Sequence, residues 1–312
     1  MYERKSSLSE MWFVSLFLLV LALISLNGCT SIQTAARRGN LKEVERQLAL
    51  GVNVNSRHFF TRDTTLIEAA GHGRVEIVKL LIDRGADVNL KGEAWYGPLH
   101  AAAYGGHVEV VKLLLDNGAD VNIFNHDKPL HYAAKNGHIE VAEMLIAHGA
   151  DINARGMSKQ TPLGTAVSNR QEEMVEYLLS KGADVNAGAN YGCTPLHRAV
   201  SKRNMELARL LSEHGANADF KCNGRTALIA SVFNYDAEMT EMLLSFGADV
   251  NAKDDYENTP LYISCQCDNV EIGRILLASG ADPAIECGGR PVSKEFLKSL
   301  GQYEQKDAKR PD

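Results

Sequence analysis

The stretch GPLHAAAYGGHVEVVKLLLDNGADVN, residues 97–122, recurs with small changes along almost the whole chain. The glycine that ends the segment LLLDNG has counterparts in every copy, and successive counterparts are 31 to 34 residues apart. A fixed period of about 33 residues predicts an array of stacked supersecondary units, because one unit alone cannot bury its apolar face. These glycines are Gly51, Gly85, Gly118, Gly149, Gly182, Gly215, Gly247 and Gly280.

A second marker opens each copy, usually one residue before a Pro-Leu step, and lies 21 residues before the marker glycine. The remaining part of each period varies between 10 and 13 residues. A segment that tolerates no insertion is what two short packed helices require, since one extra residue rotates an apolar helix face by about 100°. The variable part is then an exposed loop. The opening residues are Thr64, Gly97, Lys128, Thr161, Thr194, Thr226 and Thr259.

These motifs resemble the ankyrin repeat. The resemblance lies in TPLH at residues 194–197, GHVEVV at 106–111 and GADVN at 85–89, and it extends from about residue 30 to about residue 300. It implies an all-α repeat fold, an ankyrin solenoid of helix-turn-helix units with β-hairpin fingers. We expect a capping helix pair at 29–55, seven ankyrin repeats at 56–284, a C-terminal cap at 285–303 and a disordered tail at 304–312.

The first 28 residues differ in composition from the rest and are expected to be a lipoprotein signal peptide. Arg4 and Lys5 precede an apolar run from Met11 to Leu26, and Leu-Asn-Gly-Cys at 26–29 resembles the lipobox of bacterial lipoproteins, in which the cysteine is lipidated. The alternative is an uncleaved membrane anchor, but sixteen helical residues span only about 24 Å of a core about 30 Å thick. Cleavage before Cys29 also leaves the first helix pair whole.

The turn between the two helices of each unit carries glycine at Gly39, Gly73, Gly106 and Gly137. A left-handed backbone at this position would favour glycine, because another residue there costs about 1 kcal/mol or more. Later copies have other residues instead, so we predict a locally less stable second half, which amide exchange can test. The replacements are Arg170, Arg203, Tyr235 and Asp268.

The sequence contains no recognisable catalytic or cofactor-binding motif. The net charge of −6 and pI near 6.0 disfavour nucleic-acid binding. The histidines and aspartates recur at fixed repeat positions, and the sequence holds no phosphate loop, nucleophile elbow or H-E-x-x-H. We therefore expect no enzyme activity, no cofactor and no metal. Of the six cysteines, Cys193 and Cys222 fall in successive fingers, and the sequence leaves open whether they pair.

The copies differ most in the fingers and on the first helix, where we predict the protein-binding residues. Large aromatics on exposed loops are typical anchors of interfaces, although each could instead pack on a neighbouring finger or helix. Phe220 is a further finger aromatic. The candidates are Phe59, Phe60, Trp95, Tyr96, Phe124, Tyr191 and Tyr256 in the fingers, and Tyr132, Arg198 and Phe233 on first helices.

Together these features predict a monomeric, non-catalytic scaffold that binds another protein and is anchored to a membrane through lipidated Cys29. By analogy with lipoproteins, Thr30 after the cysteine slightly favours the outer membrane and a periplasmic location in the bacterial envelope. Two alternatives stay open. One is a periplasmic metal-binding or enzymatic factor that uses His and Cys of adjacent repeats, and the other is a host-directed ankyrin effector.

Overall fold

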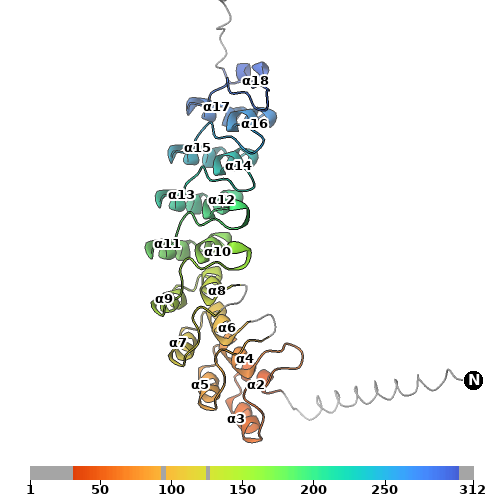
Figure 1. Cartoon of the computed structure of the whole chain (residues 1–312), viewed down its shortest axis with the longest axis vertical. Coiled ribbons are helices and arrows are strands. Elements are labelled where there is room, and N and C mark those ends of the chain that lie inside the picture. The colour runs from red at the N-terminus through yellow and green to blue at the C-terminus, as the bar shows by residue number, and fades with distance from the viewer. Residues whose placement is uncertain (1–30, 93–95, 124–126, 302–312) are drawn as a thin grey trace, which may run out of the picture. The chain divides into compact units, whose positions relative to one another are not determined.

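A computed structural model describes residues 31–92, 96–123 and 127–301 (Figure 1). These residues hold seventeen α-helices, α2 to α18, and no strand. None of these helices is long and apolar enough to cross a membrane. The chain divides between residues 125 and 126 into two compact units, which are described separately. The expected signal peptide, Cys29 and the expected tail at 304–312 lie outside the described residues.

Unit 1 consists of three antiparallel helix pairs. The first helices contact one another in series, and the second helices form a parallel row beside them (Figure 1). The pairs are α2 (Ile32–Arg38) with α3 (Leu41–Ala49), α4 (Thr65–Gly71) with α5 (Val75–Asp83), and α6 (Pro98–Gly105) with α7 (Val108–Asp116).

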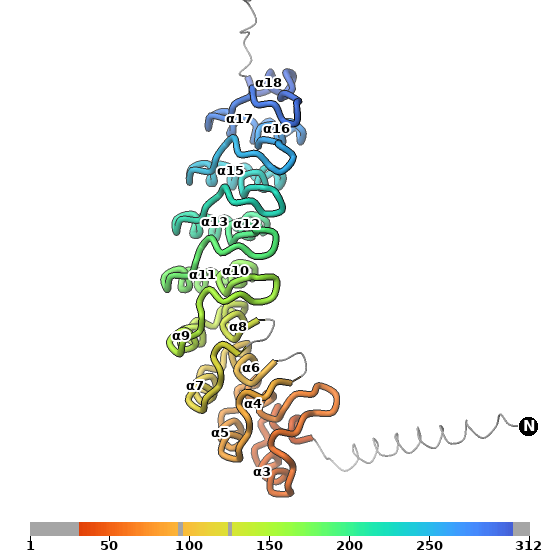
Figure 2. Tube along the Cα trace, in the orientation of Figure 1, coloured from red at the N-terminus to blue at the C-terminus, as the bar shows by residue number. Residues whose placement is uncertain are grey.

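Unit 2 repeats this arrangement five times and ends in a single helix. Figure 2 shows its interhelical loops projecting to one side of the helix rows. The pairs are α8 (Pro129–Asn136) with α9 (Ile139–Ala147), α10 (Pro162–Ser168) with α11 (Glu172–Ser180), α12 (Pro195–Ser201) with α13 (Met205–Glu213), α14 (Ala227–Phe233) with α15 (Ala237–Ser245), and α16 (Pro260–Gln266) with α17 (Val270–Ala278), followed by α18 (Lys294–Ser299).

Each first helix begins where the sequence motif predicts. The hydroxyl of Thr64 accepts a hydrogen bond from the backbone N–H of Ile67 at 3.2 Å, and so satisfies one free donor of the first turn. Thr161, Thr194, Thr226 and Thr259 cap their helices in the same way. The prolines that follow most of these caps stand in the first turn, where the missing N–H costs nothing.

The turn between paired helices is left-handed in every repeat. Gly39, Gly73, Gly106 and Gly137 have φ between 65° and 77°, as the sequence predicts. The later copies keep this backbone without glycine, at Arg170 (φ 57°), Arg203 (φ 50°), Tyr235 (φ 56°) and Asp268 (φ 50°). The fold therefore imposes the same turn on residues for which that conformation is unfavourable.

The fingers are tight turns, and the expected β-hairpins are reduced to single bridges. Isolated antiparallel bridges join Arg57 to Thr64, Cys222 to Arg225 and Cys287 to Arg290. The short loops leave no length for a ladder, and hydrogen bonds along the array hold them. The ring of buried His197, for example, lies 3.2 Å through Nε2 from the carbonyl oxygen of Arg225 in the next finger.

The recurring aspartates and asparagines also serve the fold. The carboxylate of Asp184 accepts from the backbone N–H of Asn186 at 2.9 Å, and the N–H of Asp184 donates to the side chain of Asn153 at 2.9 Å. Equivalent bonds link successive loops within each unit. These carboxylates are thus part of the scaffold, as their periodicity predicts.

The core of each repeat consists of leucines and small residues. Leu163, Leu178 and Leu196 are fully buried, and buried alanines such as Ala166 and Ala199 let neighbouring helices approach closely. At the C-terminal end, α18 begins at Lys294, within the expected C-terminal cap at 285–303. The hydroxyl of Ser293 caps this helix, accepting from the N–H of Phe296 at 3.4 Å.

Candidate protein-binding surface

The first finger of unit 1 presents two exposed phenylalanines. Phe59 and Phe60 are 79% and 72% exposed, and their rings meet edge to face with centroids 5.0 Å apart. The ring of His58 lies 6.0 Å from that of Phe60. Such a cluster leaves a large apolar area in water, which is unfavourable unless a partner covers it.

Two tyrosines of unit 2 are equally exposed at finger tips. Tyr191 is 80% and Tyr256 75% exposed. Tyr191 also has a positive φ of 60°, and its backbone carbonyl accepts from the N–H of Asn223 in the next finger at 3.1 Å. Phe220, in that next finger, is partly exposed.

Other predicted residues are less exposed and make contacts within their own repeat. The hydroxyl of Tyr96 donates to the carbonyl oxygen of His100 at 3.1 Å. Tyr132 on α8 is half-buried, and burial followed by the charge of Asp127 raises its pKa. Phe233 on α14 lies under the guanidinium of Arg225, whose Cζ is 4.2 Å from the ring centroid.

Three predicted residues complete the set. Arg198 is partly exposed on α12. Trp95 and Phe124 lie outside the described residues. The exposed side chains that the sequence interpretation missed include Met157 in a finger tip and Tyr235 in a helix–helix turn. Tyr235 could have been found, because it stands where earlier copies have glycine.

A disulfide joins two of these fingers. Cys193 and Cys222 are bonded, with Cα atoms 4.3 Å apart, and the bond ties the finger of Tyr191 to the finger of Phe220. Cys265, Cys267 and Cys287 are free thiols. The finger pair that carries two exposed aromatics is therefore covalently fixed.

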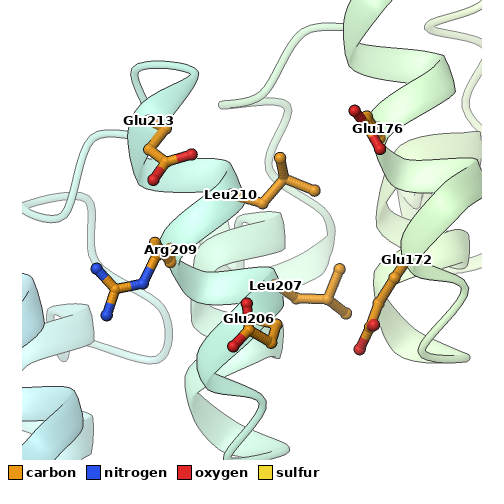
Figure 3. Close-up of a pocket in the computed structure, with 7 residues that line it drawn as sticks. All are labelled: Glu172, Glu176, Glu206, Leu207, Arg209, Leu210 and Glu213. Carbon is orange, nitrogen blue, oxygen red and sulfur yellow. The ribbon is translucent and has the colours of Figure 1, made fainter.

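The row of second helices in unit 2 carries a shallow acidic hollow between α11 and α13. In Figure 3, Leu207 and Leu210 of α13 face Glu172 and Glu176 of α11, while Arg209 points away. Glu206 and Glu213 complete the lining. Across residues 31–92, 96–123 and 127–301, no group of three or more His, Cys, Asp or Glu side chains could hold a metal ion.

Within each unit, stacked helix pairs with exposed side chains on projecting loops define a repeat solenoid, a class of protein that binds partners over an extended surface. Family models described as "Ankyrin repeats (3 copies)" match residues 94–156, 154–222 and 217–287, and a model described as "Ankyrin repeats (many copies)" matches residues 66–115. The matches cover more than half of the chain, which therefore belongs to the ankyrin repeat family.

Similar proteins share the repeats in varied contexts. The chain is 43% identical over 66 residues to the "ADP-ribosylation factor GTPase-activating protein AGD2" of Arabidopsis thaliana, a match covering 21% of this chain and only 8% of that protein. It is 39% identical over 79 residues to the "Notch-regulated ankyrin repeat-containing protein" of Xenopus tropicalis, covering 23% of this chain and 67% of that protein. The crystal structure of the human ASB11 ankyrin repeat domain aligns at TM-score 0.60 and 29% identity, over 82% of this chain and all of that one.

Membership of this family makes the chain a protein-interaction scaffold. The most exposed finger aromatics are Phe59 and Phe60 in unit 1 and Tyr191 and Tyr256 in unit 2.

Proposed function

We propose that this protein is a non-catalytic, monomeric scaffold anchored in the bacterial cell envelope, which binds another protein through the fingers of its ankyrin repeats. The observation that carries the proposal is the exposure of Tyr191 and Tyr256 at finger tips of unit 2. A tyrosine in this position offers a large contact area and a polar hydroxyl at a low cost in side-chain entropy.

The envelope location rests on the N-terminal sequence and is supported by the disulfide. Lipid on Cys29 would hold the repeats at the membrane, since several acyl chains at about 0.8 kcal/mol per buried CH₂ bind firmly. The Cys193–Cys222 bond fits this location, because disulfides persist in oxidising compartments such as the bacterial periplasm.

A pull-down with matched variants tests the binding surface. The full chain, tagged at its C-terminus, should recover one dominant protein from envelope extracts, and Tyr191→Ala with Tyr256→Ala should abolish that recovery. Phe246→Ala is the control, because Phe246 is also an exposed aromatic but caps the second helix α15. Equal recovery by the finger variant and the control would reject this surface.

A separate labelling experiment tests the anchor. Wild-type protein should incorporate a clickable fatty acid and sediment with membranes, whereas Cys29→Ser should do neither. Labelling of Cys29→Ser at the wild-type level would reject lipidation at Cys29. Native protein in the medium or the host cytosol would reject the envelope anchor and support the host-directed alternative.

A further inference from the structure

In three successive repeats of unit 2, those of α10 to α15, the charges are separated by position within the repeat, whereas the fingers before α8 and α16 carry Asp127, Asp254, Asp255 and Glu257. We define the finger face of unit 2 as the segments 155–171, 188–204 and 220–235, each of which runs from a finger tip through a first helix to the following turn. These segments contain eight arginines and lysines and no aspartate or glutamate. The basic residues are Arg155, Lys159, Arg170, Arg198, Lys202, Arg203, Lys221 and Arg225.

The second helices of the same repeats have the opposite sign. Helices α11, α13 and α15 carry seven glutamates and a single basic residue, Arg209. Four of these glutamates line the hollow of Figure 3. The net charge of −6 thus hides a basic surface on one side of the repeats.

Most of the basic charge on the finger face is not neutralised. Within the described part of the chain, one of these eight side chains forms an ion pair with a carboxylate. Lys221 Nζ lies 3.1 Å from Asp255 Oδ1, in the finger that follows the last of the three segments. Asp184 and Asp219, which precede two of the segments, accept hydrogen bonds from backbone N–H groups. A positive potential therefore remains over the middle of the face.

Two of the arginines are retained at a cost to the fold. Arg170 and Arg203 occupy the left-handed turn position that is glycine in the first four units. Each donates from Nη2 to a carbonyl of the next turn, Arg170 to Lys202 at 2.9 Å and Arg203 to Asn234 at 2.5 Å. These bonds hold both guanidinium groups at the surface. Tyr235 and Asp268 adopt the same turn in the next two repeats, so the strained position places two cations and one aromatic ring beside the first helices of α10 to α15.

Apolar side chains lie among the cations. Met157, Tyr191 and Tyr235 are exposed on the finger face, and the stacking of Arg225 on Phe233 adds a flat cationic surface. Exposed aromatics among unpaired cations are the complement of a chain that alternates carboxylates with apolar side chains.

We propose that the finger face of unit 2 binds an acidic polypeptide segment that also carries apolar or aromatic side chains. The carboxylates lie against Arg170, Arg198 and Arg203, and the apolar side chains lie against Tyr191 and Tyr235. This inference rests on the proposed function, because it assigns the chemistry of the protein partner. A polypeptide fits better than a nucleic acid, since the glutamate-rich second helices repel a long phosphate backbone.

The test is a selection from a phage-displayed library of random peptides on the immobilised full chain, followed by anisotropy titration of the best peptide. The informative variant is Arg170→Gly with Arg203→Gly, which removes two charges and relieves two left-handed residues, so that its melting temperature should equal or exceed that of the wild type. Arg209→Ala is the matched control, because it removes one arginine from the second-helix side.

We expect the selected peptides to be rich in Asp, Glu and aromatic residues. The double glycine variant should bind the best peptide roughly 3- to 30-fold more weakly, and binding should weaken with added salt, while Arg209→Ala binds like the wild type. Peptides without acidic enrichment that still need Tyr191 would overturn this inference and leave the proposed function standing. Failure to select any peptide that needs the finger face would count against both. Equal or tighter binding of a single-stranded RNA oligonucleotide with the same arginine dependence would also overturn the assignment.

Discussion

Loss of the Cys193–Cys222 disulfide should destabilise unit 2 strongly. The two cysteines are 29 residues apart in sequence, and the chain-entropy relation for a loop of this length gives about 3.5 kcal/mol at 25 °C. The closed loop includes helices α12 and α13. In the unfolded state, reduction therefore removes the constraint on the segment that forms one complete helix pair.

The folded fingers should change little when the bond is removed. The N–H of Asn223 donates to the carbonyl of Tyr191 at 3.1 Å, and the N–H of Asp255 donates to that of Gly224 at 3.0 Å. These bonds keep neighbouring fingers together without the sulfur bridge. Most of the expected loss then acts through the unfolded state, where the bridge restricts the chain.

Urea unfolding followed by far-ultraviolet circular dichroism measures this effect. The midpoint of the unit 2 transition should fall by more than about 1 M on adding dithiothreitol, given typical urea dependences of about 1–3 kcal/mol per molar. Cys193→Ser with Cys222→Ser should unfold like the reduced wild type under both conditions. Cys267→Ser should retain the full response to dithiothreitol, because Cys267 is a free thiol. Identical unfolding of oxidised and reduced wild type, or free thiols at both positions after air oxidation, would refute this reasoning.

Three further predictions concern particular side chains. Arg37→Ala should lower the free energy of unfolding of unit 1 by about 1–2 kcal/mol in urea titrations, because Glu68 is only 6% exposed and would lose two bonds from the guanidinium, at 2.9 and 2.6 Å. Burial lowers the pKa of His131 and His197, so unit 2 should be most stable above pH 6.5 and lose stability as the pH falls through the folded-state pKa values, as urea midpoints across this range will show. Arg203→Gly should raise the melting temperature by roughly 2–4 °C, because it relieves about 1 kcal/mol of left-handed strain.

Each of these predictions has a control in the same chain. Arg38→Ala alters an exposed neighbour and should leave stability unchanged; an equal loss in both arginine variants would mean that the pair with Glu68 is unimportant. His214→Asn, on an exposed helix end, should keep the acid sensitivity of the wild type. A flat pH profile would contradict the role of the buried rings. A lower melting temperature for Arg203→Gly would show that its bond to Asn234 outweighs the strain.

Local rules explain why the helices could be predicted from sequence. Each repeat has its own helix signals, namely a threonine cap, a first-turn proline and a fixed 21-residue module. Because these signals act within single repeats, the repeating sequence predicts a repeating pair of helices. The histidines and aspartates could be assigned to the scaffold for the same reason, since each makes the same bond in successive copies. The expected hairpin fingers are instead loops with at most a single bridge between residues of the same finger.

The candidate site was harder to predict because exposure depends on the contacts that each side chain makes after folding. Tyr96 and Tyr191 both precede a first helix, but the Tyr96 hydroxyl bonds to the carbonyl of His100, whereas Tyr191 stands at a finger tip with a positive φ. The repeat register separates these two cases, because Tyr96 is one residue before the opening Gly97, whereas Tyr191 and Tyr256 are each three residues before an opening threonine. The pairing of Cys193 with Cys222 likewise depends on side-chain directions at the finger tips, which sequence spacing leaves open.

The basic face was present in the sequence but was hidden by summation along the chain. The net charge sets the electrostatic potential far from the protein, and here the glutamates of all the second helices together outweigh the basic residues of the finger face. In the repeats of α10 to α15, sorting the charges by position puts seven glutamates on the second helices and eight arginines and lysines on the finger tips, first helices and turns. The turn that is glycine in four units holds Arg170 and Arg203 in two later ones and Tyr235 and Asp268 in the last two, so replacing Arg170 and Arg203 by glycine separates the contribution of these charges from the stability of the fold.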